Sequence, residues 1–285
     1  MDMIRRFLKS DAFKRLKRNR LAIIGLIVLF IIFMLSIFAP FIAPHNPYEQ
    51  DFFNTLEDPS WEYPLGTDDL GRCLLSRIIY GARYSVSIGF ISVSIGLIIG
   101  VPVGALSGYF GGKLDLVVQR FVDIMMAFPG MLLAITIVAV MGVGLVNAMI
   151  AVGIVNIPQY IRLVRGDVLS VKNSEHVEAA RALGRGDGMI IIKHVLPQCL
   201  APIIVFSSLQ IATAILWAAG LGFLGLGAQA PTPEWGAMLS QGRDYIRTAH
   251  HATTYPGVAI MIAVMGFNLV GDGLRDALDP RMKNQ

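Results

Sequence analysis

Five long stretches of this chain contain no aspartate, glutamate, lysine or arginine. A helix that crosses the hydrocarbon core of a bilayer needs about 20 consecutive apolar residues, and every one of these stretches is longer than that. Only 15% of the chain is charged, whereas a soluble domain has about 25% charged residues. The sequence therefore predicts a helical integral membrane protein. The charge-free stretches are 21–44, 84–112, 124–161, 198–233 and 248–271.

The stretch at 124–161 is too long for one span, and the segment "MGVGLVN" at 141–147 interrupts it. We therefore expect two helices here, the first starting a little before residue 124. One helix each within 21–44, 84–112, 198–226 and 255–274 bring the predicted total to six. A cleaved signal peptide is the alternative for the first stretch, but the apolar core of a signal is only about 7–15 residues long. The predicted fold is all-α with six transmembrane helices.

Basic residues are distributed unequally between the two predicted sides. All but five of the 24 lysines and arginines fall on the side of the N-terminus. Because cytoplasmic loops carry an excess of Lys and Arg, both termini are predicted to be cytoplasmic. The formal charge of +4 then reflects topology and not a nucleic-acid partner. The five exceptions are Arg72, Arg77, Arg83, Arg243 and Arg247.

The predicted organisation follows from these spans. After a first external loop at 45–83, a five-helix core at 84–275 contains a cytoplasmic element at 167–197 and a second external loop at 227–254. Leucines and an isoleucine in the first external loop recur at helical spacing, which predicts a helix lying in the membrane interface. The remaining segments are a basic cytoplasmic N-terminus at 1–20, the first transmembrane helix at 21–44 and a cytoplasmic C-terminus at 276–285. The spaced residues are Leu70, Leu74, Leu75 and Ile78.

The sequence has no catalytic or nucleotide-binding motif. Its one Gly-Lys pair, in "FGGKLD", is followed by leucine, so the phosphate-binding pattern GxxxxGK[ST] is absent. The histidines are scattered without a ligand set, so no metal site is predicted, and they are expected to be solvated or to cap helices. The two cysteines, Cys73 and Cys199, are far apart in the predicted topology and are expected to be free. Ion-coupled carriers keep ionisable residues deep in the membrane. Here the middles of the spans are neutral, which argues against a carrier that powers its own transport.

A polar interruption, "EHVEAARALGRGDGMIIIKHVLP", occupies residues 175–197 between the fourth and fifth spans. Asn173 or Ser174 can cap a first short helix, and Gly184 follows its last turn. Asp187 can cap a second helix, which Pro197 is expected to kink where it enters the fifth span. The residues alone leave two interpretations open, an ordinary cytoplasmic loop or a docking element for another protein.

The segment "EAARALG", with His194, Leu196 and Pro197 following, resembles the EAA signature of ABC importer permeases. In that family the segment is the coupling helix, which sits in a cleft of the ATPase subunit and transmits its closure to the membrane helices. The resemblance implies a type I ABC importer permease fold and assigns coupling to eight residues. They are Glu178, Ala179, Ala180, Leu183, Gly184, Asp187, Leu196 and Pro197.

Further blocks, among them "PLGTDDLGRCLLSRIIYGAR" and "LGFLGLGAQAPTPEWGAML", resemble the C-type permeases of dipeptide, oligopeptide, glutathione and nickel importers over residues 17–283. One departure is Cys73, where that family usually has aspartate. The resemblance implies a bacterial or archaeal inner-membrane subunit that pairs with a second permease, two ATPase subunits and an external solute-binding protein. ATP and Mg would be bound by the partners, with no cofactor in this chain. Dipeptides or short oligopeptides are the expected cargo, with glutathione or nickel complexes as the alternative. The more remote alternative for the function is a stand-alone secondary carrier or channel.

Two sets of residues within the spans are candidates for helix packing and for the substrate path. Glycines spaced four apart form a groove that lets another helix approach closely, either within this subunit or from a partner permease. Three amides need hydrogen-bond partners inside the membrane, from neighbouring helices or along a substrate path. The glycines are Gly96, Gly100, Gly104 and Gly108, and the amides are Asn156, Gln159 and Gln210.

Overall fold

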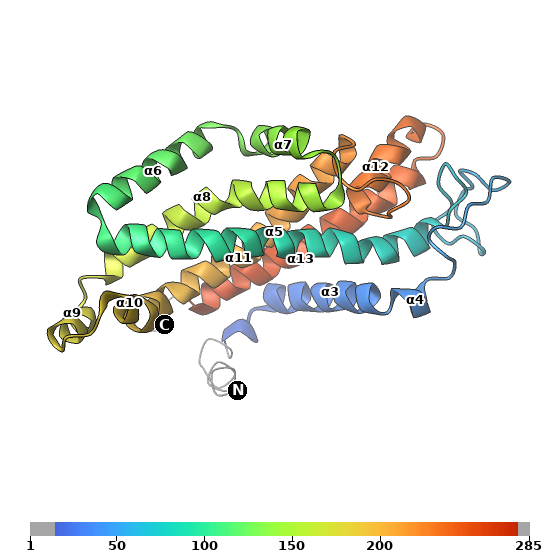
Figure 1. The fold of residues 1–285 in the computed structure, drawn as a ribbon. Coiled ribbons are helices and arrows are strands. Elements are labelled where there is room, and N and C mark those ends of the chain that lie inside the picture. The colour runs from blue at the N-terminus through green and yellow to red at the C-terminus, as the bar shows by residue number, and fades with distance from the viewer. Residues whose placement is uncertain (1–14, 279–285) are drawn as a thin grey trace.

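Five long helices lie side by side in the computed structural model, which describes residues 15–278 (Figure 1). Within that range the only β-structure is an isolated bridge between Thr67 and Cys73. Both termini fall partly outside the described residues. The long helices are α3 (Arg20–Ile37), α5 (Leu74–Phe110), α8 (Leu145–Val171), α11 (Leu196–Phe223) and α13 (His251–Leu278).

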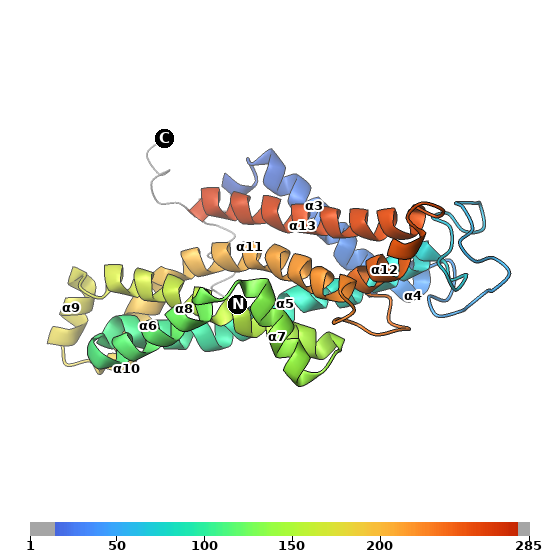
Figure 2. The same ribbon diagram turned by 90° about the horizontal axis from the view of Figure 1, so that it is seen from above.

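The helices form layers, with α11 lying between α13 and the pair α5 and α8 (Figure 2). Helix α3 packs mainly against α13 and also contacts α5. The short helix α9 (Glu175–Ala182) lies at one end of the bundle, and α4 (Ala39–Ile42) and α12 (Trp235–Gly242) lie at the other (Figure 1). We refer to these as the α9 end and the α12 end.

Helix α5 is longer than the predicted second span. At 1.5 Å per residue its 37 residues extend over about 55 Å, well beyond the roughly 30 Å hydrocarbon core. Residues 74–83, expected as a separate interfacial helix, are instead its first turns. The helical spacing correctly indicated a helix. No proline or other helix-ending signal separates these turns from the span, so the two are continuous. Arg77, which lies within these first turns, is buried.

The predicted third span is broken in two. Helices α6 (Gly112–Ala127) and α7 (Gly130–Met141) meet at an angle of 92°. Phe128 adopts an extended conformation before Pro129, as the residue before a proline usually must. The turn predicted at 141–147 is present between α7 and α8. The described residues thus hold five helices long and apolar enough to cross a membrane, or six if α6 and α7 form one broken span.

The helix is not broken at Pro197, where the sequence predicts a kink. The helix α10 (Asp187–Ile190), the π-helical turn η1 (Ile191–Val195) and α11 form one continuous helix from Asp187 to Phe223. Pro197 has no N–H to donate to the turn before it, and the wider π-helical turn directly precedes it. The missing hydrogen bond is accommodated by a change of helix type and not by a break.

The glycine row of α5 lies against α8 within this chain. A Cβ at Gly104 would be 2.7 Å from the carbonyl oxygen of Ile161, and one at Gly108 would be 3.0 Å from that of Arg165. Gly96 and Gly100 face Tyr160 in the same way. Side chains at these positions would force the two helices apart, so the row sets how closely α5 and α8 approach.

Candidate functional site at the α9 end

A glycine corner joins α9 to α10. Gly184 has a φ of +75°, the left-handed conformation that glycine adopts readily. The Gly184 N–H donates to the Arg181 carbonyl at 2.9 Å, and the Arg185 N–H donates to the Ala180 carbonyl at 3.2 Å. These two bonds form a Schellman motif, which satisfies the last carbonyls of α9. Gly184 therefore ends the helix as predicted, and it fixes the direction in which the chain leaves.

Helix α9 has one buried and one exposed face. Val177 and Ala180 are buried in a cluster formed with α5, α8 and the start of α11. Glu178 and Ala179 are exposed, and the Leu183 side chain is 82% exposed. Of the residues assigned to coupling, Ala180 thus holds the helix in place, while its neighbours present a small, partly apolar surface.

The start of α9 follows the prediction, and that of α10 does not. Ser174 occupies the N-cap position of α9, although its hydroxyl donates to the Val171 carbonyl at 2.6 Å and does not accept from the helix. Gly186 is the N-cap of α10, and Asp187 is the first residue inside that helix. The Asp187 carboxylate accepts instead from the Tyr109 hydroxyl at 2.8 Å, because the end of α5 lies beside it.

The last two residues assigned to coupling lie further along the chain. Leu196 and Pro197 are the first residues of α11, and Leu196 packs against the same cluster as α9. Pro197 is exposed. The structure therefore places these two residues behind the corner, where α10 continues into the long helix, and not on the surface formed by Glu178 and Leu183.

The three candidate amides meet between α8 and α11. The Gln210 amide nitrogen donates to Gln159 Oε1 at 2.6 Å and lies 3.3 Å from Asn156 Oδ1. Asn156 and Gln210 are buried, and the Asn156 Nδ2 group has no hydrogen-bond partner within residues 15–278. The sequence predicts that each amide needs a hydrogen-bond partner. The structure shows that Gln210 of α11 is the partner of both candidate amides of α8.

Replacing Gln210 with leucine is expected to lower the stability of the folded subunit by about 1 kcal/mol, because it leaves two amides unsatisfied in an apolar interior. Thermal unfolding of the purified protein in detergent measures the loss. The matched control is Thr213→Val on the same helix, whose hydroxyl donates only to the Leu209 carbonyl of its own helix. Equal shifts for the two variants would show that the contact between α8 and α11 contributes nothing.

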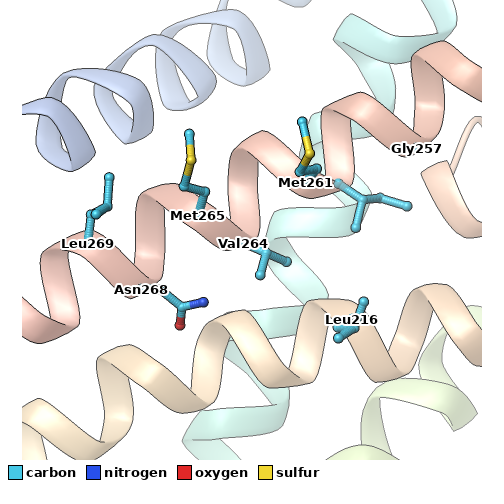
Figure 3. A pocket seen from close by; sticks show the side chains of 8 residues that line it. Leu216, Gly257, Met261, Val264, Met265, Asn268 and Leu269 are labelled. Carbon is cyan, nitrogen blue, oxygen red and sulfur yellow. The ribbon is translucent and has the colours of Figure 1, made fainter.

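A groove of about 490 Å³ opens between α11 and α13 (Figure 3). It is lined mostly by apolar side chains, including Leu216, Met261 and Met265. The Asn268 amide points from α13 toward α11 along this groove (Figure 3). An amide facing hydrocarbon would need a protein partner, so the groove is better suited to protein or solute than to lipid.

Two family models match the chain. One, described as "Binding-protein-dependent transport system inner membrane component", matches residues 100–284. The other, described as "N-terminal TM domain of oligopeptide transport permease C", matches residues 7–59. The chain belongs to the binding-protein-dependent permease family. It is therefore a multi-pass membrane component of a transport system, and the resemblance to C-type permeases of ABC importers is confirmed.

Curated relatives agree over nearly the whole length. The dipeptide transport system permease protein DppC of Alkalihalophilus pseudofirmus is 52% identical, over 96% of this chain and 90% of the relative. DppC of Haemophilus influenzae is 47% identical, over 94% and 92%. The glutathione transport system permease protein GsiD of Pectobacterium atrosepticum is 42% identical, over 96% and 91%. All three names are those of permease subunits.

A solved structure of the MetNI methionine ABC transporter contains a chain of similar fold. The TM-score is 0.58 at 23% sequence identity, covering 71% of this chain and 96% of that chain. At this identity the likeness shows the fold alone. The all-helical fold predicted for the core is therefore that of an ABC importer permease.

The α12 end of this permease holds a buried charge cluster that the sequence analysis missed. Arg72 and Arg77 are 1% and 0% exposed. Their Nε atoms lie 2.7 and 3.2 Å from Asp68 Oδ2, and both approach Gln241 Oε1 through Nη2, at 3.2 and 3.5 Å. Arg77 also donates to the Pro47 carbonyl at 3.1 Å. The cluster ties the loop before α5 to α12. The i,i+4 spacing of Asp68 and Arg72 was the one signal available.

His251 is a second correction at this end. It was expected to be solvated or to cap a helix, but it is buried as the first residue of α13. Its Nε2 atom lies 3.2 Å from the Thr67 carbonyl oxygen. The loop that carries Thr67 folds over the start of α13, which no local pattern in the sequence indicates.

Glu234 is the N-cap residue of α12 and is also buried. Its carboxylate accepts from the N–H groups of Gly236 and Ala237 at 2.9 and 2.8 Å, and Ser85 of α5 donates to it at 3.2 Å. Burial raises the pKa of Glu234 above its ordinary value, although these three donors act in the opposite direction. This residue caps the helix and joins it to α5.

Cys73 occupies the N-cap position of α5, where an aspartate would accept hydrogen bonds from the first turn. The thiol makes no such bond, and both cysteines are free and buried. The departure noted from the C-type pattern therefore removes a helix cap in this chain.

Proposed function

We propose that this chain is the C-type permease subunit of an ABC importer for dipeptides or short oligopeptides. Three relatives named as dipeptide or di/tripeptide permeases are 47–52% identical to it, whereas two named as glutathione permeases are 42% and 44% identical. The chain contains no phosphate-binding GxxxxGK[ST] loop, so separate subunits would supply the energy from ATP.

The assembly would contain a second permease, two ATPase subunits that bind ATP and Mg, and an external solute-binding protein. We place the α9 end and both termini in the cytoplasm of a bacterial or archaeal cell, and the α12 end outside. The excess of Lys and Arg supports this orientation, since Lys172, Arg181 and Arg185 all lie beside the corner.

The observation that carries the proposal is the exposed surface of the corner. Leu183 is 82% exposed, and a Cβ at Gly184, Gly186 or Gly188 would meet no described atom within 4 Å. A leucine among bare glycines offers a partner an apolar contact and close approach to the backbone. A cleft of the ATPase subunit would fit over this surface, and Glu178 would fix how the two surfaces align. Closure of the cleft would move α10 and α11, which continues from it.

We propose that two of the three amides hold helices together and that the third borders the substrate path. Asn156 and Gln210 are buried and would hold α8 to α11. Gln159 is only partly buried, so it is the member that would border the path. In such an assembly most of the affinity for cargo would reside in the binding protein, and no covalent chemistry would occur in this subunit.

The test is purification of the tagged chain from its native membrane, followed by uptake assays in proteoliposomes. Recovery of a second permease and P-loop ATPases, with ATP-dependent uptake of a labelled dipeptide, is the expected result. If glutathione or a nickel complex is taken up and dipeptides are not, the alternative cargo is favoured. Isolation as a homo-oligomer that survives crosslinking, with uptake driven by an ion gradient, would refute the assignment in favour of a carrier.

A further inference from the structure

Tyr109 lies where α5 meets the corner. It is the penultimate residue of that helix and is buried in the same cluster as Val177 and Ala180 of α9. Ile190 of α10 belongs to this cluster as well. One aromatic side chain from the end of α5 therefore packs against both helices that flank Gly184.

The hydroxyl of Tyr109 bonds to both helices. It donates to Asp187 Oδ1 of α10 at 2.8 Å and accepts from Arg181 Nη2 of α9 at 3.4 Å. The Arg181 guanidinium also lies 5.9 Å from the centre of the tyrosine ring, within the range of a cation–π contact. We refer to Tyr109, Arg181 and Asp187 as the tyrosine clamp.

The end of α5 that carries Tyr109 is itself held in place. Lys172 Nζ donates to the Gly108 carbonyl at 2.9 Å, so a residue beyond α8 caps the end of α5. Directly before Gly108, Ser107 donates to Asp115 of α6, and Arg165 of α8 binds both oxygens of that carboxylate at 2.6 and 2.7 Å. The clamp thus joins the corner to a point fixed by three helices.

Other contacts of the corner are of a different kind. His176 of α9 meets Gln198 of α11, and both side chains are exposed. The covalent path from the corner runs through α10 into α11. The clamp adds a second route, from the corner into α5, whose other end carries Arg77 in the buried charge cluster at the α12 end.

We propose that Tyr109 is a positioning residue that fixes the corner to α5, so that displacement of the corner moves α5 together with α11. The proposal rests on the proposed function, because the force on the corner would come from the ATPase. It assigns α5 an active part in the transport cycle, where the glycine row alone suggests only packing against α8.

The experiment compares Tyr109→Phe with the unchanged chain in the complete complex, reconstituted with its binding protein. The variant loses one hydroxyl and keeps the ring packing. Peptide transported per ATP hydrolysed is expected to fall on the order of fivefold, the equivalent of losing the 2.8 Å hydrogen bond to Asp187. Co-purification of the ATPase and the yield of the complex should remain unchanged. Hydrogen exchange across residues 175–190 should become faster, because the corner is no longer held to α5.

Two variants at Asp187 test the same bond from its other side. Asp187→Asn keeps an oxygen that can accept from Tyr109 and should therefore lose less coupling than Asp187→Ala, which removes that bond. Combining Tyr109→Phe with Asp187→Ala should cause no loss beyond that of Tyr109→Phe alone, because the phenylalanine has already removed the bond to Asp187. Additive losses, or unchanged transport per ATP in Tyr109→Phe, would overturn the proposal while leaving the proposed function intact. Absence of ATP-driven uptake in the unchanged complex would overturn both.

Discussion

Asp68→Asn is expected to destabilise the α12 end of this permease strongly. The carboxylate faces two buried guanidinium groups, those of Arg72 and Arg77, and its Oδ1 also accepts from the N–H groups of Leu70 and Arg72 at 3.0 Å. The amide of the variant would remove the negative charge between two buried positive ones. Breaking a buried ion pair in this way costs about 3–5 kcal/mol. Thermal unfolding of the purified complex should show a lower midpoint.

Asp69→Asn is the matched control, one residue along the chain. Asp69 lies 3.7 Å from Arg72 Nη2 and its side chain is 27% exposed. Burial and the neighbouring Asp68 raise the pKa of Asp69 above its ordinary value, so its charge is already disfavoured. Its neutralisation should change the unfolding midpoint little. Equal shifts for the two variants would mean that the loop, and not the ion pairs, determines stability at this end.

The helical spans were predictable because hydropathy is a local property. Charge-free stretches mark the places where helices must be buried in lipid or protein, and the turn at 141–147 interrupts one of them. The corner at Gly184 was predictable for a similar reason, since a helix stop depends on the few residues around it. The sequence also identified the family, because the segment around Glu178 combines several such local signals.

The charge cluster was not predictable, because burial of an arginine depends on what folds over it. Arg77 falls within the segment predicted as an interfacial helix, where an arginine would ordinarily reach the headgroups. Its partners Gln241 and Pro47 come from segments far away in the chain. The same holds for Asp187, whose partner Tyr109 lies 78 residues earlier. Periodicity shows which face of a helix is apolar, but not which neighbour covers it.

Gly184→Val is expected to abolish most of the transport that ATP hydrolysis drives. Valine at a φ of +75° is strained by about 1–3 kcal/mol, since its branched Cβ clashes with the backbone in this conformation. The Schellman motif would open, and the chain would leave α9 in another direction. The surface around Leu183 would then no longer be presented to the ATPase in one geometry. We expect uptake to fall by about tenfold while ATP hydrolysis continues, as measured on the reconstituted complex.

Gly188→Val is the matched control for this change. Gly188 lies inside α10 and, as at Gly184, a Cβ there would meet no described atom within 4 Å. Its φ is not positive, and valine is a better helix former than glycine, so the backbone should be unaffected. If both variants lose uptake equally, added bulk on the docking surface is the cause, and the corner has no special part. Normal uptake in Gly184→Val would mean that the segment is an ordinary loop and that the ATPase acts elsewhere on this subunit.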